Sequence, residues 1–124
     1  MKRILFVIAA SAVVYVASAS AAAAAETRVT LDNIEVTPTG TIWTGDIFST
    51  KKSCKNKRKV TVFRVRGGAD EKRGSTLSYK GSDQPGYFWA YGEDGVAPPG
   101  GYYAKVRKTD GCKADRSPVY ELTP

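Results

Sequence analysis

The stretch that decides the fold is Thr41-Ile-Trp-Thr-Gly-Asp-Ile-Phe-Ser49. Its residues alternate with a period of two, which is the repeat of a β-strand and not of a helix. One face of this strand carries Trp43, Gly45 and Ile47, and the other face carries Ile42, Thr44, Asp46 and Phe48. The stretch therefore predicts one strand of a β-protein.

Similar segments lie on both sides of this strand, and turns rich in Gly, Pro and Asp separate them about every 8–12 residues. We predict about seven strands, near residues 28–36, 41–49, 60–66, 75–80, 87–91, 101–108 and 117–122, the first with one phase shift, and a charged loop over 67–74. This rhythm favours an all-β fold of two antiparallel sheets in a Greek-key sandwich, of the prealbumin or immunoglobulin-like kind. The third and sixth strands of such a sandwich are antiparallel neighbours.

The first 25 residues have the layout of a secretory signal peptide. Lys2 and Arg3 precede an apolar stretch, and small residues end in Ala23-Ala24-Ala25. A retained membrane anchor is the alternative, but the Ala- and Ser-rich second half suits a peptidase better than a lipid core. Cleavage after Ala25 leaves a single domain over 26–124, and cleavage after Ala19 also fits the pattern. The leader predicts a protein that is secreted or held in the cell envelope.

Composition narrows the functions that this domain can have. The chain contains no histidine and has a formal net charge of +7. The missing histidine excludes Ser-His-Asp and Cys-His catalysis and removes the commonest metal ligand. We therefore predict a protein that is not an enzyme, with no cofactor, no metal site and no small-molecule substrate. A moderate positive charge is a hint toward anionic partners.

Cys54 and Cys112 are the two cysteines of the chain. In an exported domain an even pair predicts a disulfide, although free thiols and a metal site are the alternatives. The two cysteines flank the third and sixth predicted strands, whose ends lie side by side if those strands are neighbours. We expect a bond between them to contribute roughly 4 kcal/mol through chain entropy.

Three segments carry a family resemblance: Trp43 to Ser49, Arg58 to Val65 and Pro99 to Val106. Together they resemble small exported bacterial β-sandwich domains of the transthyretin-like and carboxypeptidase-regulatory-like kind. The resemblance covers roughly residues 41–119 and implies a fold but no activity. The related hydroxyisourate hydrolases depend on histidines, so their activity does not transfer to this chain.

A basic run is the first candidate binding segment. It consists of Lys51, Lys52, Lys55, Lys57, Arg58 and Lys59, and Arg64 and Arg66 extend it onto the next strand. Such a run suits an anionic envelope polymer, a glycan or extracellular nucleic acid, which it would bind through charge and counterion release. Another envelope protein is a further partner that we consider. The alternative is a solvated loop that protects a sheet edge.

The aromatic strand near 87–91 is the second candidate. Tyr87, Trp89 and Tyr91 share one face, and Phe88 and Ala90 share the other. The first set is either an exposed stripe for stacking on a sugar ring or part of the core. Separately, Tyr102 at the start of the sixth strand is typical of a tyrosine corner, whose hydroxyl bonds the nearby backbone.

From the sequence alone we expect an exported module with a structural or interaction role. A binder of anionic polymers or carbohydrate, acting through the basic segment 51–66 or the Tyr87, Trp89 and Tyr91 face, is the alternative. A membrane enters only if the leader is retained, and the oligomeric state stays open.

Overall fold

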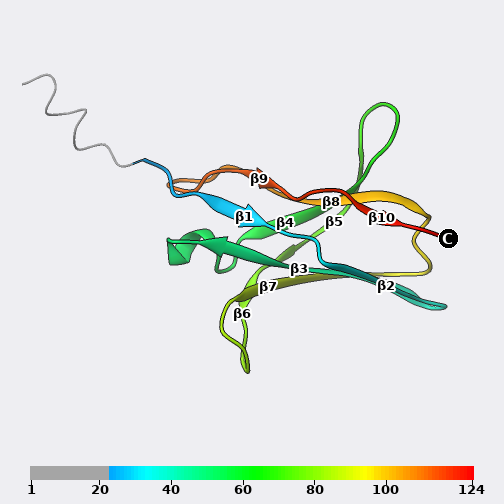
Figure 1. The fold of residues 1–124 in the computed structure, drawn as a ribbon, viewed down its shortest axis with the longest axis horizontal. Helices are drawn as coiled ribbons and strands as arrows, with labels where there is room; N and C mark the ends of the chain where they lie inside the picture. Colours follow the sequence, from blue (N-terminus) through cyan, green and yellow to red (C-terminus); the bar gives the residue numbers. More distant parts are fainter. Residues whose placement is uncertain (1–22) are drawn as a thin grey trace, which may run out of the picture.

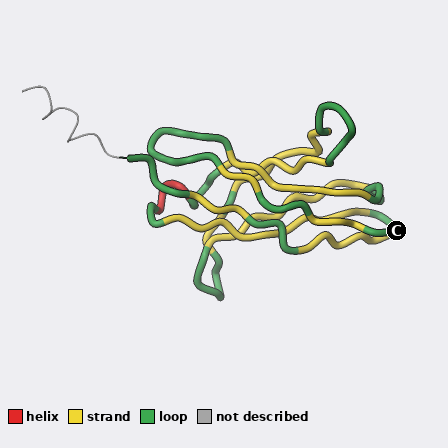
Figure 2. Tube along the Cα trace, turned by 45° about the horizontal axis from the view of Figure 1, so that its top comes forward, coloured by secondary structure: helices red, strands yellow, loops and turns green. Residues whose placement is uncertain are grey.

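The computed structural model describes residues 23–124, which form two antiparallel β-sheets packed face to face (Figure 1; Figure 2). Most of the predicted signal peptide, residues 1–22, lies outside the described part of the chain. Within 23–124 no helix is long and apolar enough to cross a membrane. The prediction of a mostly antiparallel two-sheet β-protein is confirmed.

The first sheet, called here the β3/β7 sheet, has the order β1-β3-β7-β6, with β2 also paired to β3. Its strands are β1 (Thr27–Val29), β2 (Asn33–Thr37), β3 (Gly40–Ser49), β6 (Tyr79–Lys80) and β7 (Tyr87–Asp94). The second sheet, called the β4/β8 sheet, has the order β10-β8-β4-β5, with β9 paired to β8. Its strands are β4 (Lys59–Arg64), β5 (Glu71–Leu77), β8 (Gly100–Val106), β9 (Asp115–Arg116) and β10 (Tyr120–Leu122). A single 3-10 turn, η1 (Lys52–Cys54), precedes β4.

The core fills the space between the two sheets. Trp43 and Trp89 enter it from the β3/β7 sheet, and both are fully buried. Tyr102 enters from the β4/β8 sheet, and its ring lies 5.6 Å from that of Trp43. The Tyr102 hydroxyl donates a 2.6 Å hydrogen bond to the carbonyl of Pro98, as the tyrosine-corner prediction requires. Burial raises the pKa of this hydroxyl, so it stays a donor.

The strand count is a correction, because the sandwich has ten strands and not about seven. The predicted strand at 28–36 divides into β1 and β2, which both pair with β3 but in registers that differ by one residue. This offset is the predicted phase shift and corresponds to one extra residue, as in a β-bulge. The predicted strand at 117–122 is shorter in the structure, because only β10 at Tyr120–Leu122 falls within it, and β9 at Asp115–Arg116 precedes it. Pro118 lies between the two strands and has no N–H to donate to a ladder.

The predicted strand at 75–80 divides because the chain changes sheets at Ser78. β5 pairs with β4, whereas β6 pairs with β7 in the other sheet. Ser78 is buried at this corner, where its hydroxyl donates to the carbonyl of Lys55 and accepts from the backbone N–H of Arg58. The predicted loop over 67–74 is also too long, since β5 begins at Glu71.

The predicted neighbour relation between the third and sixth strands is confirmed. β4 and β8 pair antiparallel, with Thr61 opposite Lys105 and Phe63 opposite Tyr103. This pairing places the segment before β4 next to the segment after β8. The two sheets run along the long axis of the molecule, and the β4–β5 and β6–β7 loops project from opposite sides (Figure 1).

Candidate functional site

A cationic groove of about 400 Å³ lies on the outer face of the β4/β8 sheet. Alternation along the strands builds it: Val62 and Ala104 point into the core, so Thr61, Phe63 and Lys105 point outward. Its other lining residues come from the ends of these strands and from β5: Arg58, Lys59, Lys72, Arg107, Lys108 and Thr109. Among the described residues that line this cationic groove there is no Asp or Glu.

Stacked aromatic rings and cations extend the groove along the sheet. The rings of Phe63 and Tyr103 stack at 5.4 Å, with Lys105 over Phe63 at 5.9 Å and Arg116 over Tyr103 at 3.8 Å. The Tyr103 hydroxyl donates a 2.7 Å hydrogen bond to Asp70. This bond and a second one from the backbone N–H of Arg66 lower the pKa of the Asp70 carboxyl. Asp70 therefore stays ionised and hydrogen-bonded to Tyr103 and Arg66, and it does not line the groove.

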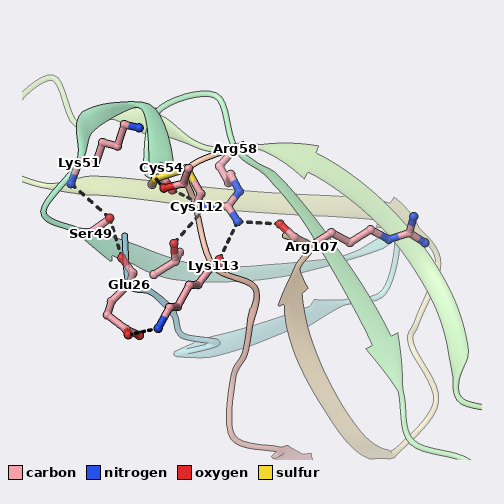
Figure 3. Close-up of a disulfide and its surroundings, with 10 residues drawn as sticks. Glu26, Ser49, Lys51, Cys54, Arg58, Arg107, Cys112 and Lys113 are labelled. Carbon is pink, nitrogen blue, oxygen red and sulfur yellow. Dashed lines mark hydrogen bonds and ion pairs between the residues drawn. A yellow bond between two sulfur atoms is a disulfide. The ribbon is translucent and has the colours of Figure 1, made fainter. Parts of the chain in front are cut away.

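The predicted disulfide between Cys54 and Cys112 is confirmed, with a Cα–Cα distance of 5.5 Å (Figure 3). Both cysteines are buried. The bond joins η1 to the turn that follows β8, so it closes the end of the sandwich next to the groove. The cysteine pair is therefore a structural staple within the described chain, in which no cysteine is free.

Arg58 lies beside this disulfide and is buried (Figure 3). Its Nη1 donates to Thr27 Oγ1 at 3.2 Å and to the carbonyl of Cys54 at 2.9 Å. Its Nη2 donates to the carbonyls of Arg107 at 2.6 Å and Lys113 at 2.9 Å. None of these four acceptors is a carboxylate, and burial lowers the pKa of the guanidinium. Arg58 is thus a buried cross-link between four segments, and its charge faces away from solvent.

The rest of the predicted basic run does not form one patch. Lys51, Lys52 and Lys57 are exposed around η1, and Lys55 covers the ring of Tyr87 at 5.1 Å. Lys59 is the one exposed member of the run 51–59 that lines the groove.

Arg64 and Arg66 belong to a different part of the molecule. Arg64 donates to the carbonyl of Pro99 at 2.9 Å, and both arginines lie about 4 Å from Glu71. Glu71 also pairs with Arg73 at 3.1 Å, and Arg73 pairs with Glu93. These two predicted binding residues are therefore held in an ion-pair network at the junction of the two sheets.

The exposed-stripe interpretation of Tyr87, Trp89 and Tyr91 is wrong, and the alternative, that this set faces the core, holds. Trp89 is fully buried and donates from Nε1 to the carbonyl of Thr30 at 2.9 Å. Tyr91 packs 5.5 Å from Trp43, and its hydroxyl donates to the carbonyl of Arg73. Tyr87 is half-buried against the same core. Three rings share this face and Phe88 alone lies on the other, so burying the larger set removes more apolar area from water.

Sequence reasoning missed four of the cations that line the groove: Lys72, Lys105, Arg107 and Lys108. Alternation along 101–108 was the available signal for Lys105, because Tyr102, Ala104 and Val106 share the other, buried face. Lys72 gave no signal, because its segment was predicted to be a loop. Their convergence depends on the β5-β4-β8 pairing, which no local pattern encodes.

Within residues 23–124, no group of three or more Cys, Asp and Glu side chains is placed to hold a metal ion. No family model, curated protein or solved structure matches the chain. The resemblance to transthyretin-like modules therefore stays a prediction.

Proposed function

We propose that this chain is a non-enzymatic module that binds an anionic polysaccharide in the cationic groove of the β4/β8 sheet. One observation carries the proposal: five exposed cations line a single groove that contains no acid. They are Lys59, Lys72, Lys105, Arg107 and Lys108. Between Lys59 and Phe63 the groove follows about 13 Å of strand β4. It therefore suits a linear polymer with repeated negative charges better than a compact ion.

The rings in the groove favour a glycan over a nucleic acid. Proteins that bind single-stranded nucleic acid stack the bases on open aromatic faces. Here Tyr103 is only 5% exposed and lies under Arg116, and Phe63 lies under Lys105. The remaining donors are mainly lysine ammonium groups, which bind sulfate and carboxylate as point charges. Charge, and not base stacking, is therefore the main source of affinity.

The proposed location is the cell envelope or the extracellular space. The leader supports export, and the disulfide suits an oxidising compartment. The absence of histidine from the sequence supports binding without catalysis. We also propose that the strands of the sandwich are connected as a Greek key of the prealbumin or immunoglobulin-like kind.

Retention on immobilised heparin tests the proposal, with elution by a salt gradient. Five phosphate-like contacts predict a loss of affinity of about 100-fold between 50 and 200 mM salt, from a slope of about −0.7 per contact. Lys105→Glu with Arg107→Glu, called the groove variant, should elute at much lower salt than the unmodified chain. The matched control, Lys51→Glu with Lys52→Glu, makes the same charge change outside the groove and should elute close to the unmodified chain.

Two results would overturn this proposal. If the control variant loses as much retention as the groove variant, net charge and not the groove governs binding. If single-stranded DNA of similar charge displaces heparin at a lower concentration than heparin displaces itself, the ligand is a nucleic acid and not a glycan.

A further inference from the structure

The outer face of the β3/β7 sheet has the opposite charge to the groove, and we call it the acidic face. One hollow of about 370 Å³ includes Asp32, Asp46 and Asp83 in its lining, and a second of about 340 Å³ includes Glu35 and Asp94 together with Glu93, whose carboxylate is already paired with Arg73. Among the described residues that line the two hollows there is no Lys or Arg. Exposed apolar side chains surround them: Ile42 is 45% exposed, Phe48 43% and Tyr79 49%.

The aromatic rings of the molecule point to a cation as the missing partner of this face. The chain covers four of its rings with its own cations: Arg28 lies over Phe48, Lys55 over Tyr87, Lys105 over Phe63 and Arg116 over Tyr103. Among the described residues no such cation covers Tyr79 or Phe88, whose rings lie 6.4 Å apart at the first hollow. Bare rings beside carboxylates are a favourable place for an ammonium group.

The carboxylates of the first hollow also lack a compensating charge within its lining. Burial, followed by the neighbouring Asp32, raises the pKa of Asp46, and only Arg28 opposes this effect. An ammonium group that entered the hollow would relieve the repulsion between the two carboxylates.

We propose that the acidic face docks the cationic groove of a second copy of this chain. The groove supplies long cationic side chains without an acid among its lining, and the acidic face supplies carboxylates, bare rings and small residues such as Gly45 and Gly92. A two-fold contact of one face with itself would oppose like charges. The contact is therefore heterologous, and successive copies add in one direction as an open stack.

The size of the two faces predicts a weak contact. The shorter face, along the seven residues of β8 and across four strands, covers about 450 Å² at standard strand spacings. Two such faces bury about 900 Å², which is below the usual range of stable complexes. We therefore expect association only at high protein concentration. The net positive charge of each copy opposes it little at 0.15 M salt, where the screening length is about 8 Å.

This inference goes beyond glycan binding but uses the same groove, so a soluble polyanion should disperse the stack. Sedimentation velocity at increasing concentration tests it on three proteins. They are the unmodified chain, the groove variant, and an acidic-face variant with Glu35→Lys, Asp83→Lys and Asp94→Lys, all exposed positions apart from the core. The unmodified chain should form a concentration-dependent series of oligomers. Each variant alone should be monomeric, with association weakened at least tenfold.

The decisive sample is an equal mixture of the two variants. One acidic face and one groove remain intact in that pair, although on different chains. Before mixing, circular dichroism and tryptophan fluorescence check that both variants are folded. The mixture should form dimers that do not grow further, whereas an isologous or edge-to-edge contact would give no such rescue. An unmodified chain that stays monomeric to the millimolar range, or a mixture without dimers, overturns the inference.

Heparin retention separates this result from the proposed function. The acidic-face variant keeps the groove and should bind heparin, even though it does not assemble. If it assembles poorly and binds heparin, both proposals stand; if the unmodified chain assembles but does not bind heparin, only the glycan proposal fails.

Discussion

Replacing Arg58 by methionine tests the interpretation that this buried arginine holds one end of the sandwich together. The substitution keeps most of the aliphatic stem but removes donors to Thr27 Oγ1 and to the carbonyls of Cys54, Arg107 and Lys113. A buried acceptor left without a donor costs about 1–3 kcal/mol. The part-buried carbonyls of Arg107 and Lys113 can accept a hydrogen bond from water instead, which recovers part of this cost. We expect a net loss of about 3–5 kcal/mol, which is a large share of the stability of a domain this small.

The assay is urea unfolding followed by the fluorescence of the buried tryptophans, without reductant so that the disulfide stays intact. In a thermal melt of the same proteins, a loss of about 3 kcal/mol should lower the melting temperature by at least about 12 °C. Arg58→Lys should recover only part of the loss, because one ammonium group cannot span four acceptors. Lys52→Met, at an exposed position of the same segment, is the control and should change stability by less than about 0.5 kcal/mol. An Arg58→Met domain within 1 kcal/mol of the unmodified domain would refute this reasoning.

Three further predictions concern other parts of the fold. Tyr102→Phe should lower the unfolding free energy by about 1 kcal/mol through the lost hydrogen bond to Pro98, and an unchanged urea midpoint would contradict the tyrosine corner. A chain that begins at Glu26 should be about 1–3 kcal/mol less stable than one that begins at Ser20, because it lacks the backbone hydrogen bonds of Ala25 to Gly111 and Lys113. Equal urea midpoints for the two chains would show that these bonds add nothing. Asp46→Asn should stabilise the domain at pH 7. The pKa of Asp46 is raised above 3.8 in the folded state, so the ionised carboxylate destabilises the fold at pH values above the folded pKa. This penalty is lost as the pH falls below 3.8. The gain should vanish near pH 3, and a gain that persists there would exclude the ionic explanation.

Local sequence patterns were sufficient for those features that depend on neighbouring residues. The period of two along 41–49 predicted β3 and the shared face of Trp43, Gly45 and Ile47, which the structure turns inward, because alternation is a local property of a strand. The phase shift between Val29 and Val36 predicted the register offset of β1 and β2. The position of Tyr102 predicted its hydrogen bond, and the even cysteine pair, read together with the predicted leader, predicted the disulfide.

Features that depend on distant segments were not predictable in the same way. The strand at 87–91 is apolar on both faces, and its orientation depends on the space opposite Trp89, where a side chain at Gly45 would overlap the carbonyl of Thr30. The basic run was predicted as one patch because charge is visible in the sequence, whereas the burial of Arg58 depends on acceptors from four separate segments. The groove likewise brings together cations from β4, β5 and the end of β8.

The measurement that tests the central claim most directly is the mapping of a sulfated hexasaccharide onto the labelled protein by NMR. Titration should shift the backbone amides of β4 and β8 that surround the groove, with the largest changes near Lys59, Lys105 and Arg107. Added salt should reverse these shifts, since the contact is ionic. Largest shifts in the exposed Lys51–Lys57 segment, or on the β3/β7 sheet, would contradict the assignment of the groove as the glycan site.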